Sequence, residues 1–190
     1  MSGVKVCPVT AEEYAAKYAV AKILPSQLAG ITKRANLLRS FKDSHYGPVG
    51  DAVGCPWWVV AVIHNQECGP DVGKFKAVLH NGEKIVGTGK KTTLVPRGKG
   101  PFATWEAAAI NALGGKGAMA KKPWDVGHAL AFLEAFNGLG YRRHGVASPY
   151  LWSYTDQYSK GKYVADGVWD ANAVSKQDGV VGLMKVLGFV

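Results

Sequence analysis

One carboxylate at the end of an apolar run is the side chain of this sequence best suited to acid catalysis. Glu67 closes a stretch that begins at Pro56, and Val60 and Ile63 precede it by seven and four residues. Residues at those spacings share one helix face, so the face that buries the two apolar side chains also turns Glu67 inward. Apolar surroundings disfavour the charged carboxylate and raise its pKa toward the range of a general acid near neutral pH. We therefore predict that Glu67 donates a proton in catalysis.

The element that positions Glu67 is predicted to be a helix of about three turns. Pro56 can open a helix because the N–H that proline lacks is not needed there, and Gly69 can close one. A negative charge at a helix C-terminus is disfavoured by the helix dipole, so helix stability does not explain the place of Glu67. The alternative interpretation is a solvated carboxylate at a helix end.

A polar, glycine-rich segment follows this helix and offers a second carboxylate. Asn81 and Gly82 form a strong two-residue turn signal between the short β-prone runs 79–87 and 91–96. We predict a small β-hairpin there, which would let a cleft form beside the acid. Glu83 is then a candidate base or electrostatic stabiliser, with a solvated turn residue as its alternative. Asn81, Thr92 and Thr93 are candidate substrate-binding residues from the same element.

The rest of the chain reads as helices and loops, which predicts an α+β, mostly α-helical fold in a single domain over residues 1–190. A capping-box pattern at Thr10 and Glu13 opens a helix to about residue 24, and a second is predicted from Ser26 to about residue 41. A glycine-rich linker is expected over 47–54 and a loop over 98–101. Further helices are predicted over 105–113, 124–136 and about 172–187.

Charge and hydropathy limit the classes of partner that this chain is expected to have. The chain carries 23 Lys and Arg against 14 Asp and Glu, a net charge of +9, which favours a polyanionic partner. Nothing resembles a nucleic-acid-binding motif, and no run of about twenty apolar residues predicts membrane insertion. The first eight residues lack the apolar core of a secretory signal. We therefore expect synthesis in the cytoplasm and action outside it only after release by another agent.

The nucleophile and metal-ligand candidates are weaker. Three cysteines at wide spacing form no Cys-x-x-Cys pair, and the histidines have no metal-ligand spacing, so we expect no disulfide framework, metal or cofactor. Cys68 with His64 one turn earlier could form a thiol nucleophile, but a buried, inert cysteine is the favoured interpretation. Glu134 is an alternative acid, and we expect it to be exposed to solvent because it lies away from the apolar stripe of its helix.

Three segments together resemble the lysozyme-like superfamily, most closely goose-type lysozymes and soluble lytic transglycosylases. They are the helix that ends in Glu67, the turn at 79–83, and the segment 133–141. Cys68 stands where those enzymes commonly have serine. Phe136 and Asn137 match their Ala-Tyr-Asn-x-Gly motif with phenylalanine for tyrosine, and no Gly-Leu-Met-Gln motif follows the acid. The segments 148–153 and 161–167 resemble small bacterial and phage peptidoglycan hydrolases, and the whole resemblance covers about residues 55–180.

This resemblance implies a lysozyme-like fold with a small β-hairpin lobe beside the cleft, and a phage endolysin. Such a monomeric enzyme would cleave the β-1,4 bond between N-acetylmuramic acid and N-acetylglucosamine in peptidoglycan, with Glu67 as general acid. The second group is Glu83 or, as in goose-type enzymes, a water held by Thr92 or Thr93. The resemblance makes Asn137 a substrate contact, and aromatic faces suited to sugars add Tyr141, Tyr150 and Tyr154. Alternatives are a lytic transglycosylase giving 1,6-anhydro products, a chitinase- or chitosanase-type hydrolase, and a wall-binding module without activity.

Overall fold

Two stretches from opposite ends of the chain pack together into one unit, and the stretch between them forms a second. In the computed structural model, which describes residues 4–189, unit 1 comprises residues 4–35 and 123–189, and unit 2 comprises residues 36–122. Residues 1–3 and 190, the first three of which belong to the N-terminal segment considered above, lie outside the described part. The prediction of one catalytic domain over 1–190 stays a prediction.

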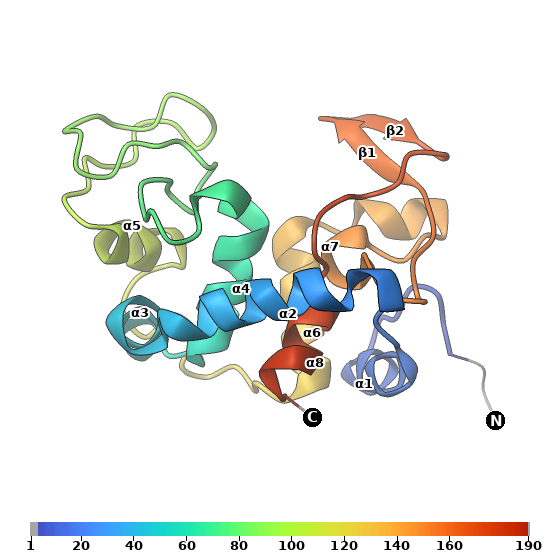
Figure 1. Cartoon of the computed structure of the whole chain (residues 1–190). Helices are drawn as coiled ribbons and strands as arrows, with labels where there is room; N and C mark the ends of the chain where they lie inside the picture. The colour runs from blue at the N-terminus through green and yellow to red at the C-terminus, as the bar shows by residue number, and fades with distance from the viewer. Residues whose placement is uncertain (1–3, 190) are drawn as a thin grey trace. The chain divides into compact units, whose positions relative to one another are not determined.

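Unit 1 is built on helices and carries a two-stranded sheet (Figure 1). Its elements are α1 (Ala11–Val20), the first part of α2 (Pro25–Ser40), α6 (Val126–Asn137), the 3-10 turn η3 (Gly140–His144), α7 (Pro149–Trp152), β1 (Lys162–Ala165), β2 (Val168–Asp170) and α8 (Val180–Leu187). Helices α1 and α6 approach closely because Gly127 has no side chain: a Cβ there would lie 2.1 Å from the Ala11 carbonyl oxygen. Leu130, Trp152 and Leu183 are fully buried in its core.

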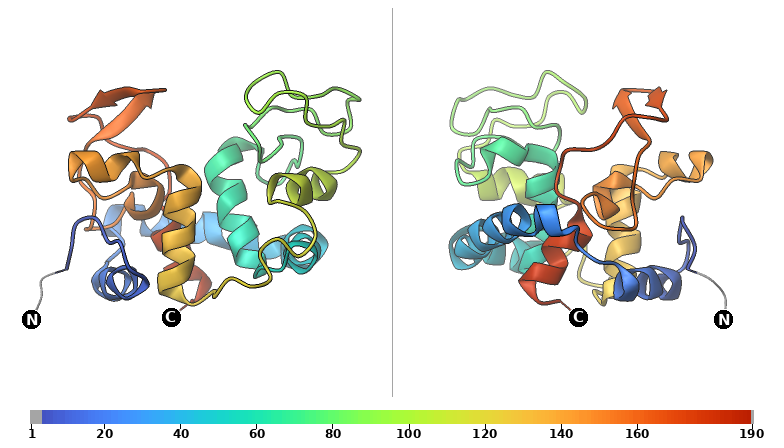
Figure 2. Two further views of the ribbon diagram at one scale, coloured as in Figure 1. Left: turned by 180° about the vertical axis from the view of Figure 1, so that it is seen from behind. Right: turned by 45° about the vertical axis from the view of Figure 1, so that its right-hand side comes forward.

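Unit 2 contains one helix that is buried along nearly its whole length. It contains the rest of α2, the π-helical turn η1 (Lys42–Tyr46), α3 (Gly47–Val53), α4 (Trp57–Cys68), the 3-10 turn η2 (Gly69–Asp71) and α5 (Trp105–Ala112). Every residue of α4 from Trp58 to Gln66 is buried. A long loop region over 72–103, green in Figures 1 and 2, extends from the C-terminal end of α4. The polar segment that follows Glu67 therefore has no regular strands.

Several predicted helix ends are confirmed, because local signals determine them. The Thr10 hydroxyl accepts from the Glu13 N–H and the Glu13 carboxylate accepts from the Thr10 N–H, so the capping box is formed. Thr104 caps α5, since its hydroxyl accepts from the Ala107 N–H. Gly69 and Gly138 end α4 and α6 with φ of 27° and 103°, a conformation that favours glycine.

Other boundaries were predicted wrongly. The turn at Gly82 exists, with a φ of 76° and its N–H bonded to the Val78 carbonyl, but the flanking runs 79–87 and 91–96 are loops. The strands lie instead at β1 and β2, which pair antiparallel in register Lys162 with Asp170. The expected linker 47–54 is mostly helix α3, and the last helix begins at Val180 rather than near residue 172. The first helix ends at Val20, four residues early.

A mostly helical α+β protein with a small antiparallel sheet is thus confirmed, although the sheet does not adjoin Glu67 in sequence. Within residues 4–189, the helices are too short or too polar to cross a membrane.

Candidate functional site

Glu67 lies on the last turn of α4, where the buried helix reaches a polar loop. Its side chain is partly exposed, whereas Val60 and Ile63 on the same face are fully buried. Glu67 is therefore the first side chain after nine buried residues to reach the surface of unit 2. A carboxyl group in this position borders both the apolar core and solvent.

The loop after α4 folds back against the helix end. The buried Asp71 carboxylate accepts hydrogen bonds from the N–H groups of Lys76 and Ala77 at 2.7 and 2.6 Å, which closes the loop. The turn that follows packs on the helix terminus: a Cβ at Gly82 would lie 3.3 Å from the Glu67 carbonyl oxygen. These contacts place residues 78–83 directly beside the end of α4.

Glu83 connects this turn to the next loop through one carboxylate. The Thr93 hydroxyl donates to it at 2.6 Å, and the N–H groups of Thr93 and Leu94 donate at 3.0 and 3.1 Å. The Asn81 amide adds a further bond at 2.8 Å. Hydrogen bonds from Thr93, above all, hold the pKa of Glu83 below its usual range. Glu83 is therefore an ionised acceptor whose lone pairs are largely engaged by the protein.

The hydroxyls proposed to hold a water are also engaged. Thr92 is buried, and its hydroxyl donates to the Pro96 carbonyl at 2.6 Å and accepts from the Lys99 N–H at 2.9 Å. Thr93 is exposed, but its hydroxyl donates to Glu83. The structure thus brings Asn81, Glu83 and Thr93 into one hydrogen-bonded cluster, the Glu83 cluster, and assigns Thr92 to the fold of the adjoining turn.

Cys68 and His64 do not form a nucleophilic pair in this structure. Burial raises the pKa of the Cys68 thiol to about 12, so the thiol is protonated at neutral pH. His64 is fully buried, and Nδ1 of its ring lies 2.9 Å from the Tyr46 hydroxyl. Burial lowers the pKa of His64 to about 4, which keeps the ring neutral. Cys68 is buried, as the favoured interpretation expected, and its lack of reactivity stays a prediction.

The predicted sugar-contacting residues of unit 1 separate into two pairs. Asn137 and Tyr141 line one groove of about 540 Å³, together with residues of β1 and of the turn after it. Tyr150 and Tyr154 are partly exposed and do not line that groove. The backbone carbonyl of Tyr154 accepts from the Leu24 N–H, which connects it to the start of α2.

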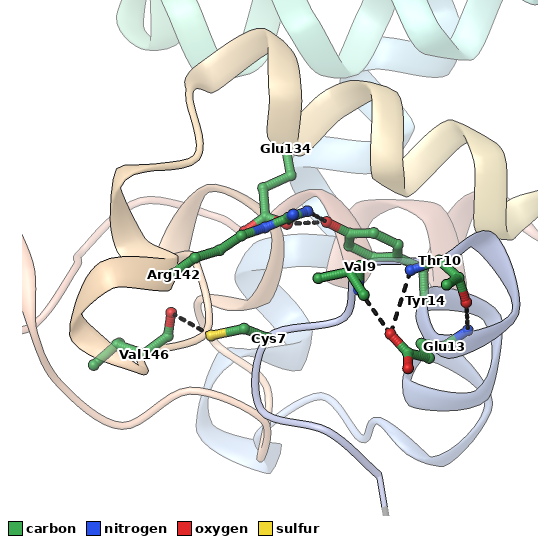
Figure 3. Close-up of polar contacts among 8 residues, drawn as sticks. All are labelled: Cys7, Val9, Thr10, Glu13, Tyr14, Glu134, Arg142 and Val146. Atoms are coloured by element: carbon green, nitrogen blue, oxygen red, sulfur yellow. Dashed lines mark hydrogen bonds and ion pairs between the residues drawn. The ribbon is translucent and has the colours of Figure 1, made fainter.

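The prediction that Glu134 is exposed to solvent was wrong, because its side chain is buried. Its carboxylate is 2% exposed and accepts hydrogen bonds from the Tyr14 hydroxyl and from Nη2 of Arg142, the latter at 3.3 Å (Figure 3). The same Arg142 nitrogen donates to the Tyr14 hydroxyl at 2.7 Å. Burial, followed by the Glu134 contact, raises the pKa of Tyr14. These three residues join α1, α6 and η3 and make Glu134 a structural carboxylate.

Two aromatic residues of β1 and β2 were missed by the sequence reasoning. Tyr163 and Trp169 pack against η3, and the Trp169 ring stacks on His144 with centroids 3.8 Å apart and planes 1° from parallel. Alternating aromatic residues on either side of the Asp166–Gly167 turn signal could have indicated this hairpin.

Within residues 4–189, the side chains form no group of three His, Cys, Asp or Glu able to hold a metal ion. Comparisons of the chain with known protein families, with curated proteins and with solved structures found no match.

Proposed function

We propose that this chain is a peptidoglycan hydrolase of the lysozyme type, an endolysin, with Glu67 as its general acid. The observation that carries the proposal is the position of Glu67: a partly exposed carboxyl group at the end of a helix buried from Trp58 to Gln66, beside a polar loop. The net charge of +9 suits an anionic wall polymer, since it increases both encounter rate and affinity.

The proposed reaction cleaves the β-1,4 bond between N-acetylmuramic acid and N-acetylglucosamine. Glu67 transfers its proton to the glycosidic oxygen as the bond from that oxygen to the anomeric carbon breaks. Positive charge then develops on the sugar ring as an oxocarbenium-like centre. A water molecule adds to the anomeric carbon, and its proton returns to the Glu67 carboxylate. The net change is hydrolysis, and the acid is regenerated.

Glu83 fits the role of an electrostatic stabiliser better than that of a nucleophile. Its carboxylate accepts hydrogen bonds from Asn81, Thr93 and Leu94, and attack on the sugar would have to displace some of them. The hydrogen bonds that hold it ionised also keep a negative charge in place near the end of α4. Such a fixed charge favours a developing cation without reorganisation.

The engaged state of Glu83 also supports a second candidate, a lytic transglycosylase. In that reaction the 6-hydroxyl of the muramic acid attacks its own anomeric carbon, so no enzyme carboxylate is needed as nucleophile. The product is a 1,6-anhydro sugar, lighter than the hydrolysed product by one water molecule. Mass analysis of the soluble fragments separates the two reactions.

The proposal is tested by the substrates that the purified protein cleaves. We expect new glycan ends from purified peptidoglycan and slower cleavage of chitin and chitosan, which lack the anionic stem peptides that a basic protein attracts. Faster cleavage of chitin or chitosan would instead assign the chain to the chitinase or chitosanase class. Wall binding without new glycan ends would identify a binding module and contradict the proposal.

A further inference from the structure

The groove that Asn137 and Tyr141 line has its own binding chemistry and lies entirely within unit 1. We call it the hairpin groove: α6 and η3 provide Asn137 and Tyr141 on one side, and Tyr163, Val164 and Asp166 line the other side, on and after β1. It is open and holds about 540 Å³, the size of small-molecule sites in proteins.

The polar side chains of this groove are available to a ligand. Within residues 4–189, the side chains of Asn137 and Asp166 form no hydrogen bond or ion pair with another residue, and both are exposed. Asn137 can donate and accept hydrogen bonds, whereas an ionised Asp166 can only accept. Asp166 is the charged side chain that lines the groove, so the groove favours a ligand rich in hydrogen-bond donors over an anion.

Apolar surface accompanies these polar groups. Val164 in the groove is 50% exposed, and Phe136 and Leu139, which flank Asn137 in the chain, are 37% and 44% exposed. The Tyr141 and Tyr163 rings lie edge to face, with centroids 5.3 Å apart. A sugar ring combines an apolar face with hydroxyl groups around its edge, and aromatic and aliphatic side chains beside polar groups match that combination.

The hairpin wall is held rigidly by packing that extends behind it. Tyr163 and Trp169 pack edge to face at 5.2 Å, and His144 bonds to the Tyr163 hydroxyl at 3.0 Å. Gly140 permits the close approach, since a Cβ there would lie 3.1 Å from the Tyr163 hydroxyl. A wall that is already ordered loses little entropy when a ligand binds.

We propose that the hairpin groove binds an uncharged N-acetylhexosamine unit of a glycan. Asp166 and Asn137 bond its hydroxyl and amide groups, and its apolar face and acetyl methyl group pack on Val164 and the tyrosine rings. The choice of a sugar of this class rests on the proposed function. The carboxylate of Asp166 disfavours muramic acid, whose lactyl group carries the anionic stem peptide, and so assigns the groove to the neutral sugar of the alternating polymer.

The experiment measures binding of the N-acetylglucosamine tetramer to the full chain carrying Glu67→Gln, which prevents cleavage during the titration. We expect saturable binding by calorimetry, with NMR shift changes at residues 137–141 and 163–167. Asp166→Ala should weaken the affinity about tenfold, the usual effect of losing a hydrogen bond to a charged group. Because the ligand is uncharged, the affinity should be independent of salt concentration.

Val164 and Val168 provide a matched pair of variants on one hairpin. They are 50% and 52% exposed, and only Val164 lines the groove. Val164→Ser should weaken tetramer binding several-fold, while Val168→Ser, the same change at a similarly exposed position of the hairpin, should leave it unchanged. The proposal would be overturned if Val164→Ser, Val168→Ser and Asp166→Ala all bound the tetramer with the same affinity. It would also be overturned if no binding were detected at millimolar tetramer. Tetramer binding in the groove by a wild-type chain that cleaves no wall would instead retract the proposed function and leave the groove assignment standing.

Discussion

Helices α4 and α6 share their length and their glycine ends but place their glutamates in opposite environments. Each spans twelve residues, each ends at a glycine with positive φ, and each carries a glutamate in its last turn or just before it. Glu134 on α6 is 2% exposed and bonded to Tyr14 and Arg142. Glu67 on α4 is partly exposed beside a polar loop.

The difference shows that distant partners, rather than local pattern, decide what a helical carboxylate does. Tyr14 lies 120 residues from Glu134 in the sequence, and no helical periodicity on α6 could indicate it. A buried carboxylate that is bonded to a cation and to a hydroxyl donor is held in place by them and cannot easily approach a substrate. A partly exposed carboxylate at the boundary of core and solvent, such as that of Glu67, can be reached by a substrate from the solvent side.

The largest expected effects come from the same substitution made in the two helices. Glu67→Gln should reduce wall lysis by more than about 100-fold, because it removes the transferable proton, and should leave thermal unfolding unchanged. Glu134→Gln should lower the free energy of unfolding by about 3 kcal/mol, because it breaks a buried charge pair, and should retain lysis below the melting temperature.

Two measurements on both variants check these expectations: turbidity clearance of permeabilised Gram-negative cells for activity, and thermal unfolding for stability. Tyr14→Phe is the matched control for the Glu134 network, since it removes one hydroxyl and should cost less stability than Glu134→Gln. Loss of lysis in Glu134→Gln with full stability would reverse the roles that we assign to the two helices.

A smaller effect on activity is expected at Glu83. Glu83→Gln retains the shape of the side chain but weakens the acceptor for Thr93 and Leu94, so it should reduce the turnover rate substantially without abolishing it. Steady-state rates of Glu83→Gln and Glu83→Ala provide the measurement. A loss equal to that of Glu67→Gln would make Glu83 a required base or nucleophile, and full activity in both variants would remove it from the site.

His64 predicts a pH dependence of stability in unit 2. Its pKa is lowered from 6.5 to about 4 by burial, so the unfolded chain binds a proton between those values and the folded chain does not. The contribution of His64 to stability is fully present above pH 6.5 and is lost as pH falls toward 4, with a total of roughly 3 kcal/mol. Denaturant unfolding at pH 7 and pH 4.5 should show a smaller decrease for His64→Gln than for wild type. An equal decrease in stability in wild type and His64→Gln would show that His64 does not cause the pH dependence.

The smallest effect is expected from thiol modification. The pKa values of Cys55 and Cys68 are each raised to about 12 by burial, so the folded protein should react slowly with iodoacetamide at both thiols, and lysis should persist after treatment. Activity should also survive EDTA. Rapid modification of Cys68 with loss of lysis would indicate a thiol mechanism.

The sequence predicted those parts of the fold that local chemistry determines. Thr10, Thr104, Gly69 and Gly138 act within a few residues of themselves, and the helix ends they predict are found. The runs 79–87 and 91–96 were predicted as strands but form loops, because side-chain bonds such as those of Glu83 hold them in place of a strand ladder. The burial of Glu134 depended on residues far away in the chain.

In the candidate site, too, the sequence predicted what local chemistry determines and missed what depends on contacts within the folded loops. Glu67 and the turn at Gly82 were predicted as neighbours from sequence, and the contact at Gly82 agrees. The engagement of Thr92 and Thr93 in bonds within the protein was not predictable, because both residues are polar, turn-prone and suited equally to holding a water molecule or a loop.

The proton donor is tested most directly by mass analysis of the fragments released from purified peptidoglycan. Wild type, Glu67→Gln and Glu12→Gln should be compared at equal concentration, with Glu12 as an exposed glutamate on α1 that takes no part in the site. We expect disaccharide-peptide fragments from wild type and Glu12→Gln and none from a fully folded Glu67→Gln. Fragments released by Glu67→Gln at the wild-type rate would contradict the assignment of Glu67 as the general acid.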